Sequence, residues 1–281
     1  MKTQIAILTR RLVHLVSILA LLSCLDLRLS TALAQGSLTP PGAPAPTMKT
    51  LDQVEPRTAI TNLPIIIGQG GSYYLTKPFA QNFTSDAITI EADNVTVDFC
   101  GFTVQQTNAT TSIVGVSINA TTAIALRNAV VKNGTIAGFA AVGITCLGGR
   151  NCLIENLHIT QCAGGIAFQA FGSAGAVGNT FRRCRFTDNT GSGVTILSGA
   201  SNLANTIESC ESVNNSTGFS LAAGGNLIIG CRASGNGINY TIAAGNRGGA
   251  IILPSASASA FNGSTGDLGT GTTDPFANLS Y

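Results

Sequence analysis

The chain has 281 residues, of which 44% are hydrophobic and only 10% are charged, with 33 Gly and no Trp. Surface helices need many Lys, Glu and Arg residues, so this composition disfavours a helical protein and favours an elongated β structure with uncharged polar turns. The formal net charge is +2, and without residues 1–34 the remainder carries 11 basic and 12 acidic residues. Such a near-neutral surface excludes the dense basic face that a nucleic-acid binder needs.

Residues 1–34 are typical of a signal peptide. A basic start precedes an apolar run at 12–25 that is too short for a comfortable membrane span. The A-x-A pattern at Ala32-Leu33-Ala34 predicts cleavage before Gln35. An alternative is the lipobox-like stretch 21–24, whose Cys24 would carry a lipid anchor. No other stretch has the pattern of a membrane span, so we expect a secreted or cell-envelope protein, periplasmic or extracellular.

Residues 35–64 form a Pro-rich arm followed by a segment, 48–63, that we expect to cover the N-terminal end of the next domain. From 65 to 254, short apolar runs alternate with Gly, Asn and Ser, and no helical periodicity persists. Asn residues recur at the start of similar runs, at 128, 151, 179, 205 and 226. A fixed local pattern with unequal spacing predicts an all-β solenoid, a parallel β-helix of about seven coils.

The alignment also predicts which residues stack on successive coils. Equivalent residues of adjacent coils lie one strand spacing apart, so they touch along the solenoid. We expect an interior column of ladder-forming Asn and space-filling Cys residues, comprising Cys100, Asn133, Asn156, Cys184, Cys210 and Cys231. An outer column of alternating charge should contain Arg185, Glu211 and Arg232. The C-terminal tail, 255–281, is expected to run back along the solenoid or to close its end, with disorder as the alternative.

Four segments carry a family resemblance, and they are 38–57, 71–76, 92–104 and 274–278. With the Asn and Cys repeats, they make the chain resemble the right-handed parallel β-helix proteins of the pectate-lyase-like superfamily, and within it a group of small exported bacterial proteins. The resemblance implies a single-stranded right-handed parallel β-helix. It implies no particular reaction, because this group has no agreed activity.

Seven cysteines remain after the leader. Cys146 and Cys152 flank a short turn and are the best candidates for an intrachain disulfide, although Cys162 could compete and ladder packing explains most of the others. No CxxC-like pair occurs, so no structural metal is expected, and the sequence implies no cofactor.

The charged residues have two interpretations. One is an ion-pair ladder exposed to solvent. The other is a sugar-acid site in which Glu155, His158 and Arg183 are the candidate catalytic residues, and Lys132, Arg182 and Arg185 bind the substrate carboxylate. The Asp-Asp pair and clustered acids of enzymatic relatives are missing from the sequence. We therefore expect a non-catalytic exported protein that binds polysaccharide or serves as an envelope or adhesion module; the alternative is a polysaccharide lyase or related sugar-acid enzyme.

Overall fold

The computed structural model describes residues 9–20, 56–108, 112–120, 125–171, 174–199, 202–252, 263–269 and 274–281. The chain divides into two units, Met1–Val54 and Glu55–Tyr281. In the first unit the described residues, 9–20, form an exposed helix. Within the part of the chain that is described, no helix combines the length and apolarity needed to cross a membrane. The A-x-A site, Cys24 and the Pro-rich stretch lie outside the described residues.

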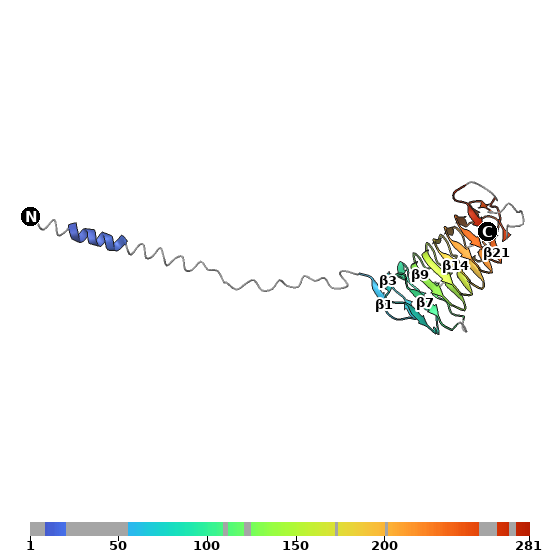
Figure 1. The fold of residues 1–281 in the computed structure, drawn as a ribbon, viewed down its shortest axis with the longest axis horizontal. Helices are drawn as coiled ribbons and strands as arrows, with labels where there is room; N and C mark the ends of the chain where they lie inside the picture. Colours follow the sequence, from blue (N-terminus) through green and yellow to red (C-terminus); the bar gives the residue numbers. More distant parts are fainter. Residues whose placement is uncertain are drawn as a thin grey trace, which may run out of the picture. The chain divides into compact units, whose positions relative to one another are not determined.

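The second unit consists of short strands joined by tight turns (Figure 1). Its first strands are β1 (Thr58–Ile60), β2 (Ile65–Ile67), β3 (Gly71–Leu75), β4 (Phe79–Gln81), β5 (Ile88–Ile90), β6 (Val95–Asp98), β7 (Thr103–Gln106), β8 (Val116–Asn119), β9 (Val130–Ala137), β10 (Val142–Leu147), β11 (Leu153–Thr160) and β12 (Gly164–Gln169). The remainder are β13 (Thr180–Arg182), β14 (Arg185–Thr187), β15 (Ser192–Ile196), β16 (Thr206–Glu208), β17 (Glu211–Val213), β18 (Thr217–Leu221), β19 (Leu227–Ile229), β20 (Arg232–Ser234), β21 (Ile238–Ile242), β22 (Arg247–Gly248), β23 (Ile251–Ile252), β24 (Gly263–Ser264) and β25 (Asn278–Ser280).

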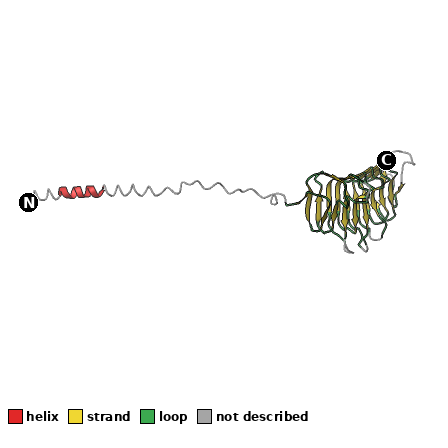
Figure 2. Ribbon diagram, turned by 90° about the horizontal axis from the view of Figure 1, so that it is seen from below, coloured by secondary structure: helices red, strands yellow, loops and turns green. Residues whose placement is uncertain are grey.

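These strands form two sheets of parallel strands, and successive coils stack along one axis (Figure 2). The nine-stranded sheet runs β2-β5-β8-β10-β12-β15-β18-β21-β24. The main path of the 16-stranded sheet runs β1-β3-β6-β9-β11-β14-β17-β20-β25-β23. The result is a β-solenoid of about eight turns, one more than the sequence indicated, and the predicted all-β parallel solenoid is confirmed.

Apolar columns fill the space between the sheets. One column follows the strand register through Val97, Val131, Ile154, Phe181, Ile207 and Ile228, and each of these side chains is fully buried. Burial of a side chain of this size stabilises the fold by about 1.5–3 kcal/mol. The stacked columns therefore form one continuous core along the described solenoid.

The predicted Asn/Cys column is wrong by one residue in the first half of the solenoid. Strand pairing aligns Asn156 with Asn133 on one side and with Arg183 on the other, so Cys184 aligns with Leu157. Cys184, Cys210 and Cys231 are buried as predicted. Cys100, Asn133 and Asn156 instead lie at an outer bend with φ angles of 51°, 61° and 54°. The reason is that Asn tolerates this left-handed conformation better than most residues.

Two true Asn ladders lie in the second half of the solenoid. The first joins Asn179, Asn205, Asn226 and Asn246 through side-chain amide bonds of 2.9, 3.0 and 3.2 Å. The second joins Asn189, Asn215 and Asn236 at 2.9 and 3.1 Å. On the preceding coil, Cys152 occupies the equivalent position of the first ladder and Cys162 that of the second. Their backbone N–H groups donate to the side chains of Asn179 and Asn189, both at 2.9 Å. These bonds satisfy turn amides that the core would otherwise leave without partners.

The described residues of the tail add strands at the C-terminal end. Strand β25 lies between β20 and β23, so the last residues of the chain fill a gap between strands that precede them in sequence. At the other end, β1 already pairs with β3, so sheet structure begins within the segment that was expected to act as the N-terminal cap.

Candidate functional site

The candidate site lies on the outer face of the 16-stranded sheet, where two columns of polar residues run across the coils. The first column follows the register Asp98, Lys132, Glu155, Arg182 and Glu208. The second follows Thr135, His158, Arg185, Glu211 and Arg232. The left-handed bend at Asn156 separates the two columns. The predicted outer column of Arg185, Glu211 and Arg232 is therefore confirmed.

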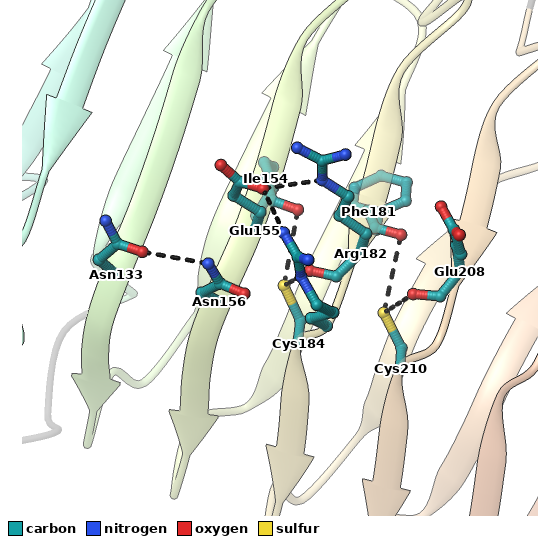
Figure 3. A network of polar contacts seen from close by, with 10 residues as sticks. Asn133, Ile154, Glu155, Asn156, Phe181, Arg182, Cys184, Glu208 and Cys210 are labelled. Carbon is teal, nitrogen blue, oxygen red and sulfur yellow. Dashed lines mark hydrogen bonds and ion pairs between the residues drawn. The ribbon is translucent and has the colours of Figure 1, made fainter.

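Glu155 is held by two arginines from the next coil (Figure 3). Its Oε2 atom accepts from Arg182 Nε at 2.7 Å and from Arg183 Nη2 at 3.1 Å. Partial desolvation raises the pKa of the Glu155 carboxyl, but the hydrogen bonds and charges of Arg182 and then Arg183 outweigh it, so the net pKa lies below its ordinary value. Glu155 is a carboxylate at neutral pH and is poorly suited to donate a proton.

The same ion pairs predict a pH-dependent stability difference. Because the folded-state pKa of Glu155 is lowered, its stabilisation is present above the unfolded-state pKa of Glu, about 4.3, and is lost as the pH falls through the folded-state pKa. We expect Glu155→Gln to lower the free energy of unfolding by up to about 1 kcal/mol at pH 7, because solvent screens these partly exposed pairs. In urea titrations, the difference should shrink as the pH falls through the folded-state pKa of Glu155 and vanish below it. Glu91→Gln, at an exposed turn, is the control, and an equal effect there would contradict the assignment.

His158 lies in the second column, opposite Thr135 and Arg185. Its Nε2 atom lies 2.8 Å from the Thr187 hydroxyl, which in turn donates to Thr160 at 3.0 Å. Burial lowers the pKa of His158, the charge of Arg185 lowers it further, and Asp188 opposes both. The ring is therefore neutral at neutral pH. Neither Lys132 nor Arg183 is paired with His158 across the strands.

The candidate substrate-binding residues are engaged in ion pairs. Arg182 contacts Glu155, and Arg185 Nε lies 3.3 Å from Glu211 Oε2. Lys132 Nζ lies 3.9 Å from Asp98, which also pairs with Arg57 at 3.5 Å. The structure brings Glu155, Arg182 and Arg183 together and leaves His158 on the other column. The geometry matches the ion-pair ladder more closely than a sugar-acid pocket.

The cysteines among the described residues are free thiols. Cys184, Cys210 and Cys231 each donate to a carbonyl of the preceding coil, at 3.6, 3.7 and 3.7 Å (Figure 3 shows the first two). The neighbouring thiol of Cys210 and then burial raise the pKa of Cys184. Cys146 and Cys152 also interact directly through their side chains, and their disulfide stays a prediction. Among the described residues, no group of three or more His, Cys, Asp or Glu side chains is placed to hold a metal ion.

Sequence reasoning missed the corner where the chain passes from the nine-stranded to the 16-stranded sheet. Two hollows of about 300 and 240 Å³ flank Arg247 there. Arg127 and Arg150 occupy the same corner on earlier coils, directly opposite one another. A signal for the pair was present, since each arginine immediately precedes one of the recurring Asn residues, Asn128 and Asn151.

Comparison with known proteins identifies the family of the chain. No curated protein matches the chain. The family model described as the right-handed β-helix region matches residues 80–265, which is more than half of the chain. That match also gives the hand of the solenoid, and the pectate-lyase-like superfamily fits the same arrangement. The chain therefore belongs to the right-handed β-helix family.

Proposed function

We propose that this chain is an exported, non-catalytic β-helix module that binds extracellular or cell-surface polysaccharide. The observation that carries the proposal is the double ion pair of Glu155 with Arg182 and Arg183. It engages three of the six residues that a sugar-acid enzyme would use. Export rests on the features of residues 1–34, namely the basic start, the short apolar run and the A-x-A pattern.

The solenoid shape supports binding to a linear polymer. Equivalent side chains recur at about 4.8 Å along the coils, so the outer faces present regular rows of groups to an extended ligand. Repeat proteins use extended surfaces of this kind for binding. An envelope or adhesion role would use the same regular rows of groups to bind polysaccharide that is attached to a cell surface.

One observation favours the alternative, a polysaccharide lyase. His158 is neutral at neutral pH and partly buried, and a neutral imidazole is the state that a general base requires. A lyase also needs a cation at the substrate carboxylate, and Arg185 stands directly opposite His158. Because Arg185 is already paired with Glu211, we rank this alternative second.

A turnover assay separates the two functions. The purified chain from Gln35 onward should release no unsaturated sugar from uronic-acid polymers, as followed by ultraviolet absorbance. It should bind polysaccharides on a glycan array. Turnover that is lost in His158→Ala but retained in the control Thr135→Ala would overturn the non-catalytic proposal and support the lyase.

A further inference from the structure

Three arginines of the solenoid differ from those on the outer face of the 16-stranded sheet. In the described ranges, Arg127, Arg150 and Arg247 have no acidic side chain within ion-pair distance, whereas Arg57, Arg182, Arg183 and Arg185 all do. All three lie on the corner that leads into the 16-stranded sheet. Arg127 and Arg150 precede β9 and β11, and Arg247 begins β22. Arg232, on the outer face, contacts the Tyr281 hydroxyl instead of an acid, so three of the arginines without an acidic partner share one corner.

Arg127 and Arg150 lie side by side on neighbouring coils. They form a parallel β-bridge, in which Arg150 N donates to Leu126 O at 2.7 Å and Asn128 N donates to Arg150 O at 3.0 Å. Like charges directly opposite one another across strands are destabilising. Asp93, on the preceding coil, is the nearest acid in this row, and its Oδ1 accepts the backbone N–H of Arg127 at 2.7 Å. The two arginines and Asp93 together therefore carry one net positive charge.

Arg150 also carries an unpaired buried donor. Its Nε atom is buried without a hydrogen-bond partner, and it is the only such side-chain nitrogen or oxygen among the described residues. Buried donors nearly always have a partner, and exceptions point to an ion or another ligand. A guanidinium Nε–H belongs to a planar fork that matches the oxygens of carboxylate and sulfate groups. An oxyanion bound between the two guanidinium groups would relieve the repulsion between the two arginines.

The corner is hollowed at the far end from this pair, beside Arg247, where Asp267 lines the smaller of the two hollows. The larger hollow extends over successive coils at Ala204, Gly225 and Gly245, where small residues in left-handed bends leave space above the backbone. The strand register places Arg247 four coils beyond Leu153, which follows Arg150 by three residues, through the pairs Leu153–Thr180, Thr180–Thr206, Thr206–Leu227 and Leu227–Arg247. At about 4.8 Å per coil, that separation is about 19 Å, a span that suits an extended polymer.

We infer that this corner is an oxyanion site, centred on Arg127 and Arg150 and continued by Arg247, for an acidic glycan that bears carboxylate or sulfate groups. The chain without its leader carries 11 basic and 12 acidic residues, so its net charge does not attract a polyanion and the local cations must do so. The inference rests on the proposed polysaccharide binding. It differs from the candidate site in location, because it uses the corner instead of the outer face of the 16-stranded sheet.

The test compares three probes with one backbone, namely dextran, carboxymethyl dextran and dextran sulfate. Binding is measured by affinity electrophoresis at low salt. We expect both acidic dextrans to retard the protein and dextran to have no effect. Arg127→Gln/Arg150→Gln should weaken binding about tenfold, and Arg247→Gln should weaken it less. Arg57→Gln removes one positive charge from an ion-paired position away from this corner and should change little. Comparison of the two acidic probes identifies the preferred group.

Thermal unfolding of each variant shows whether weaker binding comes from a lost contact or from a loss of folding. Loss of an unpaired buried donor and of a like-charge neighbour should leave the double variant as stable as the unmodified chain. If it does not fold, the exposed Arg247→Gln variant carries the test.

Equal weakening by Arg57→Gln would show general attraction and overturn the corner site. Absence of binding to either acidic dextran would also overturn it, while neutral glycan binding on the array would leave the proposed function standing. Turnover of uronic-acid polymers would instead overturn the non-catalytic function and leave an arginine-dependent corner site intact.

Discussion

Deletion of residues 274–281 is expected to lower the free energy of unfolding by about 3 kcal/mol or more, because these residues complete the C-terminal end of the solenoid. Within them, Asn278 is fully buried. Its side chain accepts from Cys231 N at 3.0 Å and donates to Ile228 O at 3.1 Å and to Gly249 O at 2.8 Å. No other described residue provides these three bonds.

The deletion also removes a partner of the core residue Tyr240. Its hydroxyl donates to Leu279 O at 2.7 Å and also lies 3.0 Å from Cys231 O. Burial raises the pKa of Tyr240 well above its ordinary value, so the hydroxyl stays protonated and needs an acceptor. Without β25, one acceptor is lost and the edge of β20 is left open to solvent or to strands of other chains.

Urea unfolding and size-exclusion chromatography check the result. The point variant Asn278→Ala should lower the free energy of unfolding by about half or more of the decrease that the deletion causes, since it removes all three side-chain bonds. Phe276→Ala lies in the same segment with 64% of its residue surface exposed, so it should change stability by less than about 0.5 kcal/mol. If the deletion variant unfolds at the same urea concentration as the full chain, β25 does not stabilise the solenoid.

The fold could be predicted from the sequence because stacked coils place similar residue types at equivalent positions of each coil. The outer Arg185–Glu211–Arg232 row needed only the register of the C-terminal coils, where the interior Cys residues mark it clearly. The interior assignment of Asn133 and Asn156 failed for a physical reason. Asn is favoured both in a buried amide ladder and in a left-handed bend, and these positions adjoin in each coil. The residue type alone does not separate them.

The candidate site was harder to predict than the fold. Sequence placed Glu155, Arg182 and Arg183 on adjacent coils, and the structure joins them. The partner of His158, Thr187, depends on where the chain bends at Asn156 and Arg183, which the misplaced register hid. The unpaired Nε of Arg150 depends on side-chain burial, and no pattern of residue types reports that.

A matched pair of Asn→Gly substitutions tests the corrected register. Asn205 is fully buried in the first ladder, where its Oδ1 accepts from Asn179 N and Nδ2 at 3.1 and 2.9 Å. Its own Nδ2 donates to Ala176 O at 2.9 Å and to Asn226 Oδ1 at 3.0 Å. Asn205→Gly leaves several buried groups without partners, so we expect a loss of about 3 kcal/mol or more in urea unfolding.

Asn156→Gly is the counterpart, and the two registers make opposite predictions for it. In an interior ladder it would cost as much as Asn205→Gly. In the structure Asn156 is exposed, has a φ of 54°, and makes one 3.2 Å side-chain bond to Asn133. Gly adopts this conformation readily, which offsets the lost bond, so we expect a change within about 0.5 kcal/mol. Equal losses for the two variants would restore the interior assignment of Asn156. A large loss for Asn205 alone would establish that the ladder begins later in the chain and that the earlier Asn residues shape its bends.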